Sequence, residues 1–429
     1  MSAFFGIVNF DGEPVDEALA RRMLDWIAYL GPDAQALWVD GSVALGHALF
    51  QTTFESAREA QPLTVDGVTI VADARLVARD DLLRELRSAG CALETTATDV
   101  DLILNAYSVW GEDCLLHLQG DFVFAIWDMH RKRLFAGRDH FGNYILYYAR
   151  VGGTLVFSTE IMAVLQHPAV PRTINERSIG DFLLFGEQWL ESSWTAYAQV
   201  FRLHRAYRLV ATADRTINER YWNLATDQPE LRYKTEDEYV EHFLSVMSQA
   251  VKERIRTDRV FISLSGGLDS SAIAAIAVDL VKRGEINAEI SAYTMAYDRI
   301  HGDNDEPYYA GLVAQALDIP IRFFSCDPYG FTAPLTMIAP EPLTVLQSGM
   351  HAVSSRQSGE QGRVYLTGVS GDEVLHESLL TESLSGMSVG GAVEEYLWLW
   401  RFTGKRPLAA RLAAVSHPAA PEAGQEAHV

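Results

Sequence analysis

The segment Ser265-Gly266-Gly267-Leu268-Asp269-Ser270-Ser271 has the composition of a loop that binds phosphate groups. It lies between the apolar run VFISL, which predicts a strand, and the run SAIAAIAVDLVKR, which predicts a helix. The first amides of a helix have no partners within it, and the helix dipole favours an anion there. The glycines would let the backbone approach phosphates closely, and the serines would add hydroxyl donors. The alternative is a tight strand-to-helix turn without a ligand.

This loop differs from the common nucleotide motifs. No Gly-Lys-Ser/Thr follows it, so it is not a Walker loop, and no dinucleotide fingerprint is present. Asp269 cannot lie against a bare phosphate, so we expect it to hold magnesium or to orient the loop. A second polar turn, Asp372-Glu373, follows the short predicted strand Val364–Thr367. Alone it would be typical of a solvated surface, but after a parallel strand it becomes a candidate ligand-binding turn.

The elements that position these loops predict two domains. In residues 1–207 short strands dominate, with turn signals between them, which predicts an α+β layered domain. The helices predicted in this domain are Val15–Ala28 and Asp99–Trp110. A hairpin and a charged linker follow in residues 208–235.

In residues 236–415 short apolar strands alternate with helices, which predicts an α/β domain with a doubly wound parallel sheet. Residues 416–429 are rich in Ala, Pro, Glu and Gly, and we expect a disordered tail there. The helices predicted in this half are Glu236–Arg254, Ser270–Lys282 and Pro307–Leu317. The strands predicted in it are Val260–Leu264, Ile290–Tyr297, Ile319–Ser325 and Val364–Thr367.

Composition and charge exclude several classes of partner. The net charge of −22 argues against nucleic acid and against an anionic membrane surface, because both need a basic footprint. Cys91, Cys114 and Cys326 lie far apart without metal-ligand spacing, so we expect reduced thiols. No signal peptide is visible, and no apolar run reaches the roughly 18 residues of a membrane span. We therefore expect a cytoplasmic protein.

Taken together, these segments resemble the asparagine synthetase family. SGGLDSS is similar to the pyrophosphate-binding loop of its ATP pyrophosphatase domain, and LTGVSGDE (Leu366–Glu373) to its second nucleotide loop. In the first half, LQGDFVFAIWD, LFAGRDHFGNYILYY and FSTEIMAVL resemble the family's glutaminase-like domain in order and spacing. The resemblance implies an N-terminal glutaminase-like domain of the Ntn type. It also implies a C-terminal sheet of the adenine nucleotide α-hydrolase type.

The resemblance further implies roles for individual residues in binding ATP. Leu264 and Met295 would flank the adenosine through backbone contacts, and Thr367 would lie against the nucleotide. Asp269 and Asp372 would hold Mg²⁺ on the pyrophosphate. The set implied for ATP and pyrophosphate is Leu264, Ser265, Gly266, Gly267, Leu268, Asp269, Ser270, Ser271, Met295, Thr367 and Gly368. The implied reaction converts a carboxylate to an acyl-adenylate, which an amine then attacks to give an amide.

The glutaminase half departs from the family's pattern. Glutamine-hydrolysing members begin Met-Cys-Gly-Ile, and the cysteine acts as the nucleophile and, through its own amine, as the base. The matching stretch here is Phe4-Phe5-Gly6-Ile7, with Phe5 in the cysteine's place, and Ser2 does not match that place by register. The degenerate glutamine positions implied are Phe5, Ala48, Asp73, Ala74, Arg75 and Asp99. We therefore expect an inactive first domain that delivers no ammonia from glutamine.

The synthetase half departs as well. Val369 stands where asparagine-forming members have a glutamate. The family's lysine for the amide step lies farther beyond the second loop than this sequence extends, because 57 residues follow Asp372 (429 − 372). Lys405 comes too early and is expected to be a surface lysine, so the catalytic residue of the amide step stays unassigned. We expect a shortened domain, or a site that another chain completes.

Three functions are compatible with these departures. The first is an ATP-dependent ligase of the lasso-peptide type, which joins the substrate's own α-amine to an aspartate or glutamate side chain. It needs no ammonia, and it implies a precursor peptide and a processing protein as partners. The second is an ammonia-dependent asparagine synthetase. The third is a catalytically incomplete protein that binds a nucleotide or a partner, and a homodimer is a further candidate assembly.

Overall fold

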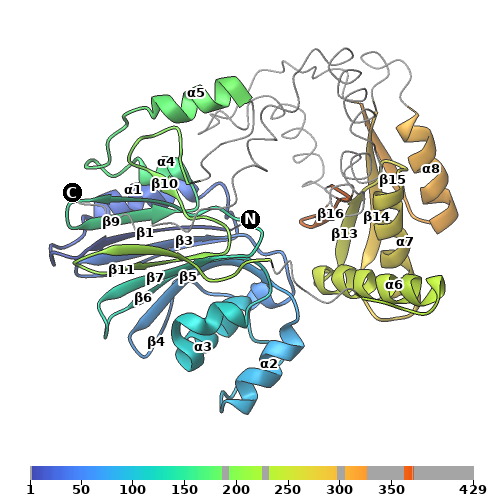
Figure 1. Cartoon of the computed structure of the whole chain (residues 1–429), viewed down its shortest axis with the longest axis horizontal. Helices are drawn as coiled ribbons and strands as arrows, with labels where there is room; N and C mark the ends of the chain where they lie inside the picture. The colour runs from blue at the N-terminus through green and yellow to red at the C-terminus, as the bar shows by residue number, and fades with distance from the viewer. Residues whose placement is uncertain are drawn as a thin grey trace, which may run out of the picture. The chain divides into compact units, whose positions relative to one another are not determined.

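The computed structural model describes residues 2–185, 193–224, 231–296, 305–325, 362–369 and 371. The described residues up to Thr367 belong to one compact unit. They form two antiparallel sheets from the N-terminal half of the chain and one parallel sheet from the C-terminal half (Figure 1). No described helix is long and apolar enough to cross a lipid bilayer.

The N-terminal half contains two six-stranded sheets. The first has the order β10-β8-β9-β1-β3-β2, and the second has the order β12-β11-β7-β6-β5-β4. Strands of the first sheet are β1 (Ala3–Asn9), β2 (Ala34–Asp40), β3 (Val43–Leu49), β8 (Tyr147–Val151), β9 (Thr154–Ser158) and β10 (Phe201–Arg202). Strands of the second are β4 (Leu63–Val65), β5 (Val68–Leu76), β6 (Gly120–Asp128), β7 (Arg133–Arg138), β11 (Tyr207–Ala211) and β12 (Thr216–Arg220).

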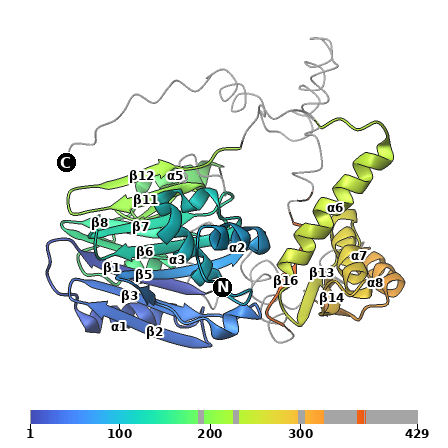
Figure 2. The ribbon, with the colours of Figure 1, turned by 90° about the horizontal axis from the view of Figure 1, so that it is seen from below.

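Helices cover the outer faces of these two sheets, as Figure 2 shows. The first sheet packs against α1 (Glu17–Ile27) and α4 (Ile161–Val164), and the second against α2 (Arg79–Ser88) and α3 (Asp99–Trp110). The remaining helical segments are α5 (Glu176–Phe185) and the 3-10 turns η1 (Glu55–Arg58) and η2 (Gly111–Leu116). These layers confirm the predicted α+β domain.

Strand alternation decides which side chains meet between the two sheets. Along β1, Phe4 and Val8 lie in the core between the sheets, whereas Phe5 and Ile7 face α1. Along β5, Val71 lies in the same central core. Successive side chains of a strand point to opposite faces, so every second residue shares a face. This alternation decides which polar residues can share a site, as the next section describes.

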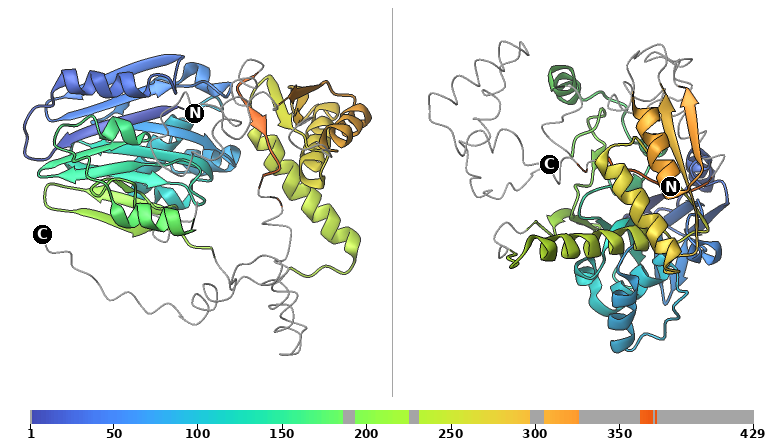
Figure 3. Two further views of the ribbon diagram at one scale, coloured as in Figure 1. Left: turned by 90° about the horizontal axis from the view of Figure 1, so that it is seen from above. Right: turned by 90° about the vertical axis from the view of Figure 1, so that its right-hand side faces the viewer.

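The C-terminal sheet contains four parallel strands among the described residues, in the order β15-β14-β13-β16. They are β13 (Arg259–Ser263), β14 (Glu289–Ala296), β15 (Ile321–Ser325) and β16 (Tyr365–Leu366). The helices are α6 (Glu236–Arg254), α7 (Leu268–Lys282) and α8 (Glu306–Leu317), and α7 and α8 lie side by side along the sheet (Figure 3). The strand order reverses between β13 and β16, which makes this the topological switch point, where open α/β sheets bind ligands. The predicted doubly wound parallel sheet is confirmed.

Several elements differ from the sequence-based expectation. The helices α2 and α5 were not predicted, although the spacing of Leu82, Leu83 and Leu86 in α2 fits a buried helical stripe. The helix α7 begins at Leu268 instead of Ser270 because Gly267 takes the N-cap position. The strands β2, β4 and β10 were also missed. Predictions for Asp372, Lys405, Cys326 and residues 416–429 fall outside the described residues.

Candidate active site

The loop after β13 lies at the switch point of the parallel sheet. The amide of Leu264 continues the pairing of the strands by donating to the carbonyl of Tyr293, at 2.9 Å. The chain then turns through Ser265 and Gly266 into α7, whose N-cap residue Gly267 provides no side-chain hydrogen bond. The first turn of α7 therefore keeps amides that no capping side chain satisfies. An anion is the natural partner for such amides.

Gly266 is required by the shape of this loop. Its φ is +80°, in the left-handed region that favours glycine. A Cβ at this position would also lie 2.4 Å from the Cβ of Tyr309 and 2.7 Å from the amide nitrogen of Ala310, both in α8. Any side chain would therefore push the loop away from α8. From the sequence we expected Gly266 to let the backbone approach a ligand closely. The structure shows that Gly266 also lets the loop pack closely against α8.

The serines of the loop divide into two roles. Ser270 is buried, and its Oγ accepts a hydrogen bond from the amide of Ser265 at 3.2 Å, so it holds the turn. The Oγ of Ser265 lies 3.1 Å from that of Ser270 and accepts from the amide of Gly267 at 3.3 Å. The Oγ of Ser271 is buried and has no hydrogen-bond partner among the described residues. Ser271 thus carries a buried hydroxyl that no described residue satisfies.

The second predicted nucleotide segment lies next to this loop. Strand β16 pairs in parallel with β13, with Leu366 opposite Ile262, so Thr367 leaves the sheet beside Leu264. The amide of Gly371 donates to the carbonyl of Gly368 at 3.1 Å. The structure therefore brings the two segments to the same edge of adjacent strands. This agrees with the sequence prediction, whereas Asp372 lies outside the described residues.

Met295 and Asp269 flank the switch point. Met295 lies near the end of β14, in register with Phe324 of β15, and is half-buried. Asp269 is in the first turn of α7 and is half-buried, so its carboxylate is accessible. No group of three or more His, Cys, Asp or Glu side chains suited to a metal ion occurs among the described residues. Asp269 alone is thus compatible with a single carboxylate contact to a magnesium ion that phosphates also hold.

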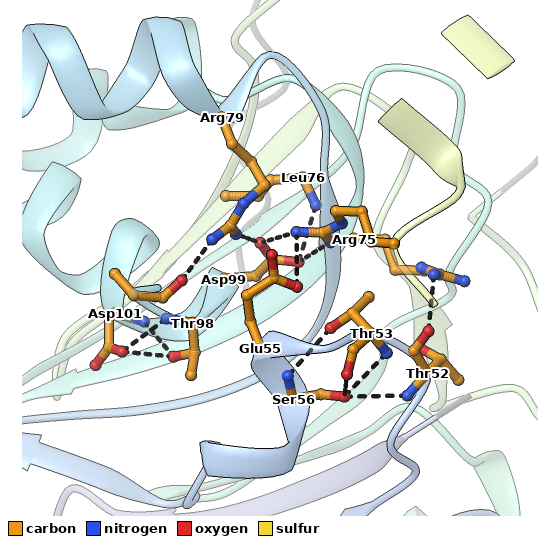
Figure 4. A network of polar contacts seen from close by, with 12 residues as sticks. Thr52, Thr53, Glu55, Ser56, Arg75, Leu76, Arg79, Thr98, Asp99 and Asp101 are labelled. Carbon is orange, nitrogen blue, oxygen red and sulfur yellow. Dashed lines mark hydrogen bonds and ion pairs between the residues drawn. The ribbon is translucent and has the colours of Figure 1, made fainter. Parts of the chain in front are cut away.

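A second polar cluster, in the N-terminal half, surrounds Asp99 at the start of α3 (Figure 4). Its buried carboxylate accepts from the amide of Leu76 at 3.2 Å and from the guanidinium of Arg79. Arg256 donates to both carboxylate oxygens, at 2.7 and 3.2 Å. Arg256 also lies 3.6 Å from Glu55. We call Asp99, Arg79, Arg256 and Glu55 the Asp99 cluster.

Within the Asp99 cluster, the hydrogen-bond acceptor sites of the Asp99 carboxylate are already occupied. Four donor contacts from Leu76, Arg79 and Arg256 already fill the acceptor sites of Asp99. An incoming ammonium group would have to displace a guanidinium from a buried pair, which is costly. The role implied for Asp99, holding a glutamine amine, therefore does not fit this arrangement. Arg79 and Arg256 were not singled out from the sequence, because nothing local marks their shared partner.

The other degenerate glutamine positions do not all come together. Asp73, Ala74 and Arg75 lie in β5, opposite Val123, Phe122 and Asp121 of β6. Asp73 and Arg75 share the face of Val71, which is the side between the sheets. In contrast, Phe5 and Ala48 are fully buried in the core under α1, on the outer face of the first sheet.

Ser2, rather than Phe5, is the residue of the N-terminal strand that reaches this polar region. Burial raises the pKa of Asp73, and a hydrogen bond from the backbone amide of Ser2 acts against that rise, so Ser2 lies beside the carboxylate. The Oγ of Ser2 accepts from the amide of Phe50 at 3.0 Å. Phe5 packs in the core under α1, on the other face of the strand, so its side chain does not line this polar region. The period of two along β1 puts even-numbered residues on the side of Asp73.

Burial also changes the charge state of neighbouring groups. The pKa of Glu59 is raised to about 7 by burial, and Asp73 and Asp101 add repulsion, whereas Gln61 and Arg256 oppose the rise. The pKa of His47 is lowered to about 4 by burial, and its Nε2 lies 3.1 Å from the carbonyl oxygen of Ala72. The region therefore favours neutral carboxyl and imidazole groups.

Comparison with known proteins agrees with this architecture. A glutamine amidotransferase domain matches residues 1–222, and an asparagine synthase domain matches residues 242–425. The chain belongs to the asparagine synthetase family. Asparagine synthetase [glutamine-hydrolyzing] 3 of Bacillus subtilis is 33% identical over 319 residues, which cover 72% of this chain and 50% of that protein. Amidase chry2 of Gibberella zeae is 27% identical over 404 residues, covering 88% of this chain and 58% of that protein.

The chain spans about half the length of the curated relatives it matches. Among solved structures, a glutamine phosphoribosylpyrophosphate amidotransferase from B. subtilis aligns with a TM-score of 0.38 and 15% identity, covering 75% of this chain and 65% of that one. Membership of the asparagine synthetase family therefore rests on the two domain matches.

Proposed function

We propose that this asparagine synthetase-like chain is an AMP-forming carbon–nitrogen ligase that activates a carboxylate with ATP. The observation that carries the proposal is the loop Ser265–Ser271 at the switch point of the parallel sheet. The α7 amides, which have no side-chain cap, provide donors for a pyrophosphate beside Thr367, and the buried Ser271 hydroxyl has no hydrogen-bond partner among the described residues. Such preorganised donors favour a leaving group that gains negative charge in the transition state.

In the proposed reaction a carboxylate oxygen attacks the α-phosphorus of ATP. The bond from that phosphorus to the bridging oxygen of the β-phosphate breaks, and pyrophosphate leaves against the loop. An amine then attacks the acyl carbon, AMP leaves with the bonding electrons, and the amine releases a proton. Magnesium bound with the nucleotide would neutralise phosphate charge, and Asp269 and Asp372 are the residues proposed to hold it.

The substrate that we propose is a peptide whose own α-amine is joined to a side-chain carboxylate, as in lasso-peptide cyclisation. Two observations support a reaction without glutamine hydrolysis. No cysteine lies near the amino terminus, where the family's nucleophile would be. The carboxylate of Asp99 is also occupied by Arg79 and Arg256. A substrate that carries its own amine needs no ammonia source.

ATP–pyrophosphate exchange tests the adenylation step. We expect exchange in the wild type with a cognate carboxylate, and loss of exchange in Asp269→Ala with an unchanged circular dichroism spectrum. Asp279→Ala is the matched control, because Asp279 lies in the same helix, is exposed and, among the described residues, forms an ion pair only with Arg283, at 2.9 Å. Exchange near the wild-type level in Asp269→Ala would refute the role of Asp269.

The choice of carboxylate separates the proposed reaction from its alternatives. Exchange stimulated by a precursor peptide, followed by loss of one water from the peptide mass, supports cyclisation. Exchange stimulated by aspartate, with asparagine formed from ammonia, would instead indicate an ammonia-dependent asparagine synthetase. ATP binding without exchange for any carboxylate would indicate a nucleotide-binding protein that lacks the ligase activity.

A further inference from the structure

Strand β16 leads directly to Thr367, yet it is only two residues long. Two residue pairs join it to β13, extended by a hydrogen bond from the amide of Phe261 to the carbonyl of Val364, at 3.1 Å. Among the described residues no strand pairs with its other side. Strands usually run to roughly 3–10 residues, so this pairing alone is a weak restraint. The position of Thr367 therefore depends on further contacts of this segment.

The residues just before β16 are packed on two sides. A Cβ at Gly362 would lie 2.3 Å from the ring of Phe261, so the absence of a side chain lets the chain lie against this ring. Val364 is buried in the core of the parallel sheet. Arg363 lies between them in the sequence, and its side chain contacts the N-terminal domain instead.

Arg363 binds Asp33 with both ends of its guanidinium. Nη2 donates to Oδ1 at 2.8 Å, and Nη1 donates to Oδ2. Nη1 also donates to the carbonyl of Gln51 at 3.1 Å, and Cζ lies 4.9 Å from the centre of the Phe50 ring. Such a fork on a carboxylate, with a ring against the guanidinium, fixes orientation as well as distance. The segment before β16 is thus held by residues about 310–330 positions earlier in the chain.

Asp33 is itself fixed before it meets Arg363. Its Oδ2 accepts from the amide of Gln51 at 2.8 Å, and its own amide donates to the carbonyl of Leu49 at 3.1 Å. The side chain of Asp33 is 16% exposed, whereas that of Arg363 is 45% exposed. The hydrogen bond from Arg363 lowers the pKa of Asp33. Surface ion pairs are weak partly because two mobile side chains must be ordered, and here one partner is already in place.

The same stretch of the N-terminal domain also holds β13. The amide of Phe54 donates to the carbonyl of Arg256 at 2.8 Å, just before β13 begins. Residues 50–54 therefore contact the chain at the start of both β13 and β16. These are the two strands whose far ends carry the nucleotide segments. A short strand is a stiff extended rod, so holding its start also places its end.

We propose that Arg363 is a positioning residue, through which Asp33 of the N-terminal domain holds β16 beside β13 and so places Thr367 at the nucleotide. The N-terminal domain then contributes to adenylation without hydrolysing glutamine. This inference rests on the proposed ATP-dependent function, because it concerns the same nucleotide site.

Amide hydrogen exchange on the full chain without nucleotide tests the anchor by itself. We expect residues 362–367 to exchange about tenfold or more faster in Arg363→Gln than in the wild type, because the charge-assisted hydrogen bonds to Asp33 are lost. Asp33→Asn should have the same effect from the other side of the pair. The double variant should exchange no faster than the faster single variant, because the two substitutions remove one interaction.

The ATP dependence of ATP–pyrophosphate exchange tests the effect on the nucleotide. In Arg363→Gln and Asp33→Asn the KM for ATP should rise about tenfold while kcat changes less than about twofold, because contacts at Thr367 bind ATP before and during the reaction. A role in folding alone would instead reduce the amount of active enzyme. It would lower the apparent kcat and leave the KM for ATP unchanged.

Arg259→Gln is the matched control. Arg259 begins β13, and among the described residues it forms an ion pair only with Glu289 of β14, at 3.4 Å. This exposed pair lies within the parallel sheet, so its loss should change neither the amide exchange of residues 362–367 nor the KM for ATP.

The two measurements separate failure of this inference from failure of the proposed function. An unchanged KM for ATP in Arg363→Gln would overturn the positioning role, whether or not amide exchange is faster, and would leave the ligase function standing. No binding of ATP to the wild type would refute the proposed function and the role of Thr367 with it, even if faster amide exchange in Arg363→Gln showed that the anchor exists.

Discussion

The Asp99 cluster and the loop Ser265–Ser271 show opposite ways of treating polar groups. In the Asp99 cluster two guanidinium groups and a backbone amide satisfy a buried carboxylate completely. In the loop the first turn of α7 has no side-chain cap, and the Ser271 hydroxyl has no described partner. Protein groups that satisfy each other stabilise the fold, whereas groups left without partners cost stability and are retained where a ligand completes them. The comparison separates a region that serves the fold from one that serves a ligand.

Removing the charge at the centre of the Asp99 cluster should have the largest effect. Asp99→Asn leaves Arg79 and Arg256 buried without their carboxylate, and breaking a buried pair in this way costs about 3–5 kcal/mol. Urea denaturation measures the free energy of unfolding. The control is Asp81→Asn, which removes an exposed pair with Arg84 and should cost less than about 1 kcal/mol. Equal stability of the two variants would show that the cluster is not structural.

Changing the backbone of the loop should have the next largest effect. Gly266→Ala combines an unfavourable φ of +80° with a clash against α8, which displaces the amides of the loop. A displacement of about 1 Å is enough to lower a rate by about hundredfold, so we expect ATP–pyrophosphate exchange to fall by that amount.

Gly284→Ala is the control for this substitution. Gly284 also has a positive φ, +71°, but a Cβ there would meet nothing within 4 Å. It should lose about 1 kcal/mol of stability through backbone strain and keep its exchange activity. If both alanine variants lose exchange equally, the close approach of α8 to the loop has no part in the effect.

A smaller effect should appear in the pH dependence of stability near the Asp99 cluster. The pKa of Glu59 is raised by burial from 4.5 to about 7, so the folded state holds its proton more tightly than the unfolded state. The stability from this group is complete below pH 4.5 and is lost as the pH rises through about 7. Glu59→Gln is neutral at every pH, so its thermal midpoint should fall less than that of the wild type over this range.

The buried His47 acts in the opposite direction but does not affect this comparison. Its pKa is lowered from 6.5 to about 4, so its contribution is lost as the pH falls through that interval, in the variant and the wild type alike. Glu13→Gln, an exposed change outside the cluster, should leave the pH profile unchanged. Identical profiles for Glu59→Gln and the wild type would show that the pKa of Glu59 is the same in the folded and unfolded states.

The sequence predicted the C-terminal sheet better than the polar site of the N-terminal domain. Apolar strands such as Val260–Leu264 and the helix Glu236–Arg254 appear close to their predicted bounds because their patterns are local. The two nucleotide segments could be assigned to one edge because parallel strands end together. The helix α2 was missed although its leucine spacing was visible.

The face to which Phe5 points could not be predicted from the sequence for a different reason. A shift along a strand by an odd number of residues moves a side chain to the other face, and only the register of β1 against β3 shows which residues face Asp73. The partnership of Asp99 with Arg256 joins residues that are 157 positions apart, and no local pattern predicts it.

By itself the sequence determined the alternation of strands and helices in the C-terminal half and the loop that opens α7, since hydrophobic period and glycine positions depend on neighbouring residues. Only the tertiary structure decided that Asp99 is neutralised within the protein, by Arg79 and Arg256. Ion pairing depends on distances between side chains from separate strands and helices, and these distances are set by how the layers pack.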